Sequence, residues 1–140
     1  MATDTYPNEG SLLHAGVVSR NDEVAPTCFW MEIRCPELAR RARPGQFIML
    51  RCGRALDPLL SRAFSICDLV IEDGEPVGIV ALQAVIGVGT EALSRREVGE
   101  EIGVLGPLGH PYALGSPDEH MVMVAGGIGF SIGWIVGRNV

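Results

Sequence analysis

The stretch LSRAFSI, residues 60–66, places an arginine and a serine inside an apolar run that is typical of a buried strand. Arg62 needs an explanation, because arginine is almost never buried without a partner and the run itself contains no acidic residue. One interpretation is a salt bridge to Asp57 or Asp68, or a solvent-exposed arginine at a sheet edge. The other is a bound anion, which the planar guanidinium grips at two points while Ser65 hydrogen-bonds a polar edge of the same ligand.

A second motif, Gly87-Val88-Gly89-Thr90, favours the bound anion. Its two glycines let the backbone approach a ligand closely, and the helix predicted over residues 88–97 offers unpaired N–H groups at its start. An ordinary strand-to-helix turn with Thr90 as N-cap predicts the same residues. Together, the strand with Arg62 and this helix start are expected to hold the two sides of one pyrophosphate.

Short β runs surround both motifs and predict a mainly β fold, an antiparallel barrel or sandwich. The 18 glycines and 9 prolines are spread along the chain and favour short elements joined by tight turns. A turn is expected at residues 20–26 and a short helical turn at 36–42. The expected strands cover residues 12–19, 27–35, 46–52, 63–71, 76–86 and 101–105.

The C-terminal part changes character. MVMVA, residues 121–125, predicts a strand, followed by the loop Gly126-Gly127-Ile128-Gly129 and a helix to residue 136, which is the opening of a parallel α/β nucleotide-binding unit. The full G-x-G-x-x-G pattern would need a glycine where Ile132 stands. A lone strand and helix cannot bury both faces of a parallel sheet, so residues 121–136 are expected to be weakly protected or to pack on another chain.

Three parts of the chain are therefore expected. They are a disordered tail at residues 1–10, a β-barrel domain at 11–109 and an incomplete NAD-binding α/β domain at 110–140.

Composition and charge exclude several function classes. With 47% hydrophobic and 20% charged residues, the 140-residue chain is expected to fold, and its length suits about one domain. The net charge of -6 argues against nucleic-acid binding, since the only basic cluster is Arg40, Arg41 and Arg43. The N-terminus has no apolar signal region and no apolar run is long enough to cross a bilayer, so a cytoplasmic location without membrane contact is expected.

Cysteine and histidine spacing predicts neither a metal site nor a catalytic residue. The cysteines lie in or beside apolar runs without a C-x-x-C pair, so we expect reduced core thiols at Cys28, Cys35, Cys52 and Cys67. No nucleophile and base are paired in sequence around the three isolated histidines, His14, His110 and His120.

Four motifs stand in an order that is more specific than any one of them: PGQF (44–47), DPLLSRAFSI (57–66), GVGTEALSRREVGEEIGVLGPLGHPY (87–112) and VMVAGGIG (122–129). In this order they resemble the ferredoxin-reductase-like flavoproteins. Within that group they look most like the electron-transfer subunits of type B dihydroorotate dehydrogenase, over about residues 12–129.

The resemblance implies an antiparallel Greek-key barrel that binds FAD, followed by a nicotinamide-binding α/β domain. In the pattern of the family, Arg62 contacts the FAD pyrophosphate, Ser65 lies near the flavin ring, and a loop of Gly126, Gly127 and Gly129 receives NAD. The implied FAD contacts are Arg62, Ala63, Phe64, Ser65, Leu82, Gln83, Ala84, Gly89 and Thr90.

By the same resemblance, FAD takes a hydride from NADH and passes single electrons to a [2Fe-2S] cluster and then to an FMN-containing catalytic dihydroorotate dehydrogenase subunit, in pyrimidine biosynthesis. This sequence departs from the family pattern in three places. Ala63 replaces the usual proline of the flavin strand, and Ile132 stands where the glycine loop usually continues into a proline. The rest of the NAD domain and the cysteines that hold the [2Fe-2S] cluster have no counterpart in this sequence. We therefore expect a fragment of an oxidoreductase subunit that does not complete the electron path alone.

Two alternatives stay open at this stage. One is another enzyme of the superfamily, either an NAD(P)H-dependent flavin reductase or a diaphorase-type subunit of a hydrogenase or sulfide dehydrogenase. The other is a flavin-free interaction module.

Overall fold

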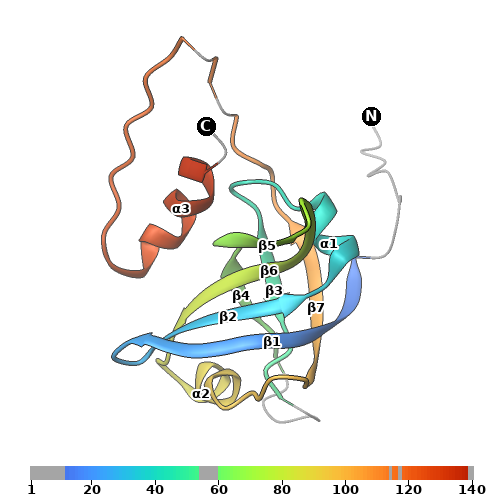
Figure 1. The fold of residues 1–140 in the computed structure, drawn as a ribbon. Coiled ribbons are helices and arrows are strands. Elements are labelled where there is room, and N and C mark those ends of the chain that lie inside the picture. Colours follow the sequence, from blue (N-terminus) through green and yellow to red (C-terminus); the bar gives the residue numbers. More distant parts are fainter. Residues whose placement is uncertain (1–11, 54–59, 114, 117, 139–140) are drawn as a thin grey trace, which may run out of the picture.

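Seven antiparallel strands form a rolled sheet in the computed structural model, which describes residues 12–53, 60–113, 115–116 and 118–138 (Figure 1). The strands are β1 (Leu13–Ala25), β2 (Cys28–Arg34), β3 (Phe47–Leu50), β4 (Arg62–Ser65), β5 (Asp68–Glu72), β6 (Glu75–Ala84) and β7 (Glu101–Leu108). The helices are α1 (Pro36–Arg41), α2 (Val88–Ser94), the 3-10 turn η1 (Gly127–Gly129) and α3 (Phe130–Arg138). The mainly β class is confirmed, with the one short helix expected at residues 88–97 present as α2 and the expected helical turn at 36–42 present as α1.

The order of the strands brings distant parts of the chain together. It runs β4-β3-β7-β1-β2-β6-β5, so β7 is inserted between β1 and β3. The sheet also rolls up, because β4, at one end of this order, contacts β6 near the other end. As a result, the strand that carries Arg62 lies beside the last residues of β6 and the start of α2.

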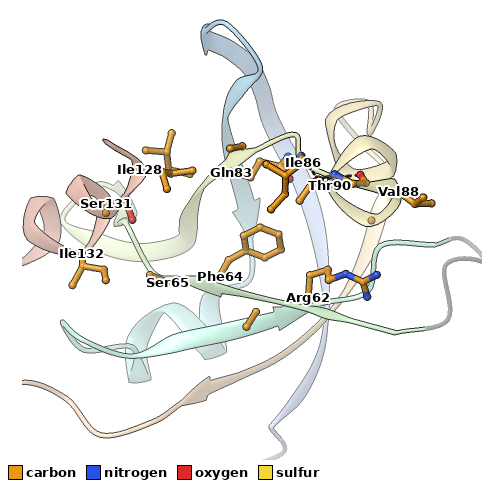
Figure 2. Close-up of a pocket in the computed structure, with 16 residues that line it drawn as sticks. Arg62, Phe64, Ser65, Gln83, Ile86, Val88, Thr90, Ile128, Ser131 and Ile132 are labelled. Carbon is orange, nitrogen blue, oxygen red and sulfur yellow. Dashed lines mark hydrogen bonds between the residues drawn. The ribbon is translucent and has the colours of Figure 1, made fainter. Parts of the chain in front are cut away.

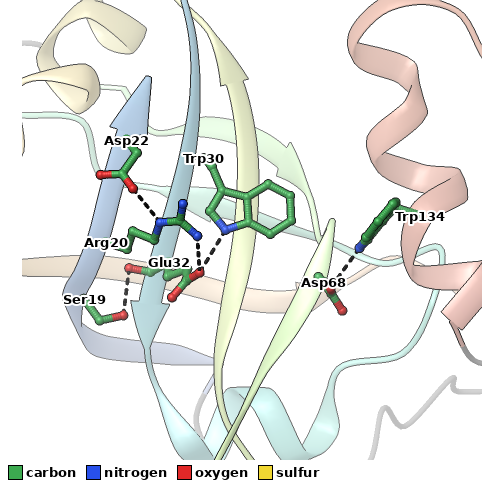
Figure 3. A network of polar contacts seen from close by, with 7 residues as sticks. All are labelled: Ser19, Arg20, Asp22, Trp30, Glu32, Asp68 and Trp134. Atoms are coloured by element: carbon green, nitrogen blue, oxygen red, sulfur yellow. Dashed lines mark hydrogen bonds and ion pairs between the residues drawn. The ribbon is translucent and has the colours of Figure 1, made fainter. Parts of the chain in front are cut away.

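The β1–β2 hairpin is longer than the sequence predicts, and the predicted turn at residues 20–26 is wrong. β1 continues to Ala25, and the chain reverses at Pro26-Thr27, where Thr27 has a φ of 60°. The polar residues that suggest a turn instead hold an exposed ribbon together, because Arg20 bonds Asp22 at 2.6 Å and reaches Glu32 on β2 (Figure 3).

The predicted strand at residues 63–71 is two strands. β4 pairs with β3 and β5 pairs with β6, so the chain must leave one edge of the sheet and join the other. The crossing falls at Ile66 and Cys67, which are each 1% exposed. Burial of the crossing itself explains why the sequence shows no break there, since buried apolar residues such as Ile66 and Cys67 carry no turn signal.

The C-terminal arm differs most from expectation. Residues 121–126 have no regular secondary structure, because no described strand lies beside them to complete a hydrogen-bonded ladder. The predicted strand is therefore not formed, although the glycine turn and helix α3 follow as expected. The helix packs on the barrel, since Ile135 and Val136 are 1% and 3% exposed and belong to its core cluster.

The division into three parts stays a prediction. Residues 1–10 lie outside the described residues, and the expected domain boundary falls within the stretch that joins β7 to the C-terminal arm. Among the described residues, every helix is too short or too polar to cross a membrane.

The cysteines are free thiols as expected, with Cys35, Cys52 and Cys67 buried and Cys28 half-buried. Burial raises the pKa of the Cys67 thiol to about 11, and the neighbouring Asp68 carboxylate adds to the effect. Because the folded state favours the neutral thiol, Cys67 contributes stability below about pH 9 that is lost as the pH rises toward 11.

Cys67 should therefore resist alkylation in the folded protein. At pH 8 about one Cys67 thiol in a thousand is ionised, and its labelling by iodoacetamide should rise about tenfold per pH unit up to pH 11. Half-buried Cys28 serves as the internal control and should label first, as peptide mass spectrometry can show. Equal labelling of Cys28 and Cys67 at pH 8 in the folded protein would contradict the buried position of Cys67.

Candidate functional site: a pocket between the barrel and helix α3

An elongated pocket of about 580 Å³ lies where β4, β6, α2 and the C-terminal arm meet (Figure 2). This volume is within the range of roughly 300–1,000 Å³ that is usual for sites of small molecules and cofactors. Its lining contains all nine residues that the sequence singles out for a cofactor: Arg62, Ala63, Phe64, Ser65, Leu82, Gln83, Ala84, Gly89 and Thr90. The remaining lining residues are Ile86, Gly87, Val88, Ile128, Gly129, Ser131 and Ile132.

Strand β4 forms one long side of the pocket. Arg62 and Phe64 are two residues apart and project to the same side of the strand, as alternation requires (Figure 2). The guanidinium of Arg62 donates from Nη1 to the Leu60 carbonyl oxygen at 2.7 Å, and no described residue forms an ion pair with it. Asp68 bonds Trp134 instead, and Asp57 lies outside the described residues. Much of the donor capacity of Arg62 is thus available to a ligand.

The Gly87–Thr90 turn is built differently from the expected N-cap. Gly87 is the N-cap of α2, and Thr90 sits three residues later. The Thr90 hydroxyl accepts hydrogen bonds from the backbone N–H groups of Ile86 at 2.9 Å and Gly87 at 3.1 Å. The hydroxyl and these two amides are therefore occupied in holding the turn, which leaves the backbone amides of the first helical residues, Val88 and Gly89, to meet a ligand.

Gly89 allows the turn to touch β4. A Cβ at this position would lie 3.1 Å from Nε of Arg62 and 3.2 Å from Sγ of Cys52, closer than side chains normally pack. Only glycine permits this approach without displacing the arginine. The two motifs of the sequence are thus in direct contact.

Gln83, at the end of β6, is the most unusual polar group of the pocket wall. Its side chain is 1% exposed, and neither Oε1 nor Nε2 has a hydrogen-bond partner among the described residues. A buried amide without partners costs about 1–3 kcal/mol, so such groups are rare and call for an explanation. A polar ligand in the pocket would supply the missing partners.

Helix α3 and the glycine loop close the other end of the pocket. Ile128, Gly129, Ser131 and Ile132 contribute to the lining, whereas Gly126 and Gly127 of the predicted nicotinamide loop do not. Ser131 is 6% exposed although it is polar. The sequence did not point to Ser131, because nothing around it departs from an ordinary apolar helix.

Asn21 positions helix α2, and no motif in the sequence indicates this role. From β1, its Nδ2 group donates to the carbonyl oxygens of Leu93 at 3.0 Å, Ser94 at 3.2 Å and Arg96 at 2.9 Å. Leu93 and Ser94 belong to the last turn of α2, and Arg96 lies just beyond it, so these bonds anchor the C-terminal end of the helix. Asn21 therefore fixes α2, and with it the turn at Gly89. Only the hairpin register, unknown from sequence, places it there.

Other chemistry has little support in the part of the chain that the structure describes. No group of three or more His, Cys, Asp or Glu side chains is placed to hold a metal ion there. His14 is buried and its Nε2 lies 3.2 Å from the Gly106 carbonyl oxygen, which makes it part of the framework rather than of the pocket.

Comparison with known proteins finds homologues of the chain. No protein-family model matches it. The "Dihydroorotate dehydrogenase B (NAD(+)), electron transfer subunit" of Desulforamulus reducens is 43% identical over 107 residues, which cover 76% of this chain and 39% of that protein. The protein of the same name from Bacillus cereus strain B4264 is 32% identical over 115 residues, covering 81% and 43%.

The chain is a homologue of these electron transfer subunits. The resemblance drawn from the four motifs is thus confirmed, and relatives of this name favour it over the flavin reductase and diaphorase alternatives. The chain spans about two fifths of the length of the electron transfer subunits that it matches.

Solved structures agree on the fold of this electron-transfer-subunit homologue. "Ferredoxin reductase in carbazole 1,9a-dioxygenase" matches with a TM-score of 0.72 at 18% identity, over 91% of this chain and 39% of that chain. Phthalate dioxygenase reductase, described as a modular structure for electron transfer from pyridine nucleotides to [2Fe-2S], matches with a TM-score of 0.70 at 15% identity, over 92% and 41%. At these identities the likeness shows the fold alone.

Replacing Asn21 should loosen α2. Asn21→Ala removes three hydrogen bonds to helix-end carbonyls, and we expect the free energy of unfolding to fall by about 1–3 kcal/mol in urea denaturation. Ser19→Ala, which removes one exposed bond to Glu32 on the same hairpin, should change it by less than about 0.5 kcal/mol. Similar losses in the two variants would argue against a special role for Asn21.

Proposed function

We propose that the pocket binds FAD, and that the chain is the flavin-binding part of an electron-transfer subunit. In the complete protein this subunit passes electrons between NADH and an iron-sulfur cluster and serves an FMN-containing catalytic subunit that oxidises dihydroorotate. The proposal rests chiefly on one observation, the convergence of nine family-matched positions on a single pocket. The homology to electron transfer subunits supports the same assignment.

The two ends of the pocket differ in chemistry, and this difference supports the orientation of the cofactor. One end presents the guanidinium of Arg62 and the backbone of the Gly87–Thr90 turn, which suit a pyrophosphate. The other presents Ile128 and Ile132 and suits the flat flavin ring system. Phe64 lies between the ends (Figure 2).

The residues present fit FAD as a ligand with both polar and apolar parts. Gln83 offers a donor and an acceptor without partners, which a flavin or its ribityl chain would satisfy. FAD supplies the exchange between a two-electron hydride and single electrons, and the protein supplies position and electrostatics. No residue of the described chain is assigned to acid-base catalysis.

The C-terminal part extends the proposal. We assign residues 11–109 to the flavin domain and 110–140 to the beginning of a nicotinamide-binding domain, with Gly126, Gly127 and Gly129 as its loop. A cytoplasmic location belongs to the same proposal. Because the chain spans about two fifths of the relatives that it matches, electron transfer by the whole subunit also belongs to the proposal.

A direct experiment tests FAD binding. The purified chain is titrated with FAD and followed by flavin absorbance after gel filtration. A stoichiometric yellow complex is expected. A colourless protein that refuses added FAD would contradict the proposal and would favour the flavin-free interaction module.

Arg62→Ala should weaken FAD binding by about 2–3 kcal/mol, roughly 30- to 150-fold in Kd, because a charge-assisted contact to the pyrophosphate is lost. Arg62→Lys keeps the charge but not the planar fork and should recover only part of the affinity. Arg95→Ala is the matched control, since it removes the same charge from an exposed residue that pairs with Glu91. Unchanged affinity in Arg62→Ala would assign Arg62 to a structural role.

Gln83→Leu should separate function from stability. Without ligand, the variant should be more stable by on the order of 1 kcal/mol, because an unpartnered buried amide is removed, yet FAD should bind roughly fivefold more weakly. Gln46→Leu is the control, since Gln46 is paired with Gly109 and Arg43. It should lose stability and keep its affinity. A Gln83→Leu protein that loses stability without ligand would refute the assignment of Gln83.

A further inference from the structure

A hydrogen bond between Trp134 and Asp68 ties helix α3 to the barrel. Nε1 of Trp134 donates to Oδ2 of Asp68 at 2.9 Å (Figure 3). Oδ1 of the same carboxylate accepts from the Leu69 backbone N–H at 2.8 Å. Asp68 is 7% exposed at the start of β5. The carboxylate is therefore held by its own strand and presents one oxygen to the helix.

Apolar contacts seat the helix but do not fix its rotation. Ile135 and Val136 are buried in the barrel's core cluster, and such burial is not directional. The Trp134 ring also stacks at an angle on Phe130, with centroids 5.6 Å apart, which stiffens the exposed side of the helix. A hydrogen bond has a preferred direction, so the contact with Asp68 selects one rotation of α3.

That rotation decides what faces the pocket. Ser131 precedes Trp134 by three residues, so the two are neighbours on the helix surface. Ser131 and Ile132 line the pocket, at the end opposite Arg62 and the Gly87–Thr90 turn (Figure 2). Turning the helix by a fraction of a turn would move both side chains away from the ligand.

We propose that Asp68 and Trp134 are positioning residues that hold α3 against the flavin-ring end of the pocket. The inference rests on the proposed function, since it takes the ligand to be FAD. It adds that FAD binding and the seating of α3 are coupled, so that each favours the other to the same extent. The pyrophosphate end, formed by β4 and α2, is independent of this contact.

The test compares two ligands. FAD reaches both ends of the pocket, whereas ADP carries the diphosphate and adenosine but no flavin ring. In Trp134→Phe and in Asp68→Asn, the Kd for FAD should rise about 5- to 20-fold, in the lower part of the usual range for coupling between sites, and the Kd for ADP should change by less than about twofold. Asp68→Asn places an amide donor against an existing donor and is the more conservative in shape.

Two further measurements exclude a merely structural effect. In the original chain, FAD but not ADP should slow hydrogen exchange of backbone amides 130–136, and in either variant this protection should be lost. The double variant should bind FAD no more weakly than the worse single variant, because both substitutions remove one shared contact.

Trp30→Phe is the matched control. It removes the same indole donor from β2, where Nε1 of Trp30 bonds Glu32 at 2.9 Å (Figure 3). FAD affinity should stay unchanged in this variant. Circular dichroism should show that all variants are folded.

Several results overturn the inference. These are unchanged FAD binding in the Trp134 and Asp68 variants, equal weakening of FAD and ADP, additive effects in the double variant, or the same loss in Trp30→Phe. If the original chain binds ADP but not FAD, or neither ligand, the proposed function itself fails and this inference falls with it. If the original chain binds FAD and the variants behave like it, only the inference fails.

Discussion

The contact between Gly89 and Arg62 is the constraint on which the pocket depends. It joins the start of α2 to the edge strand β4, and a Cβ at Gly89 would lie 3.1 Å from the Nε of Arg62. The absence of a side chain therefore sets how closely helix and strand approach. Asn21 on β1 stabilises this arrangement, because its side chain donates to three carbonyl oxygens at the opposite end of α2. Flexible loops alone would not hold the Arg62 guanidinium and the backbone amides at the start of α2 at fixed positions relative to each other.

The pocket wall around this contact retains polar groups that a stable framework does not need. Among the described residues, Gln83 is buried without a partner, which carries a free-energy cost that an apolar residue would avoid. Arg62 is only partly buried and forms no ion pair with any described residue, so its guanidinium remains available. Such groups are expected where a ligand completes their hydrogen bonds, and both face the same pocket. The opposite wall, from α3, is tied to the barrel by the hydrogen bond from Trp134 to Asp68, and we expect a ligand to influence its position.

Much of the fold was predictable, because alternating or continuous apolar runs and glycine turns mark strands directly. The pattern in β2 shows this, since Met31 and Ile33 are both 0% exposed on the inward face. The errors share one cause: a local pattern does not record which segments pair with one another. Polar residues 20–25 form an exposed ribbon that looks like a turn, and the break at Ile66-Cys67 is buried and looks like continuous strand. At residues 121–125 the local signal for a strand is present, but no partner strand lies beside it.

The sequence by itself determined the mainly β class, the two motifs around Arg62 and Gly89, and, through their order, the relationship to electron transfer subunits. These features are encoded locally, in residue type and spacing. Only the tertiary structure decided that Gln83 lacks partners, that Asn21 holds α2, and that Trp134 reaches Asp68. Each of these depends on which segments the rolled sheet brings side by side. Distances between residues far apart in the chain arise from strand register and sheet closure, which no local pattern records.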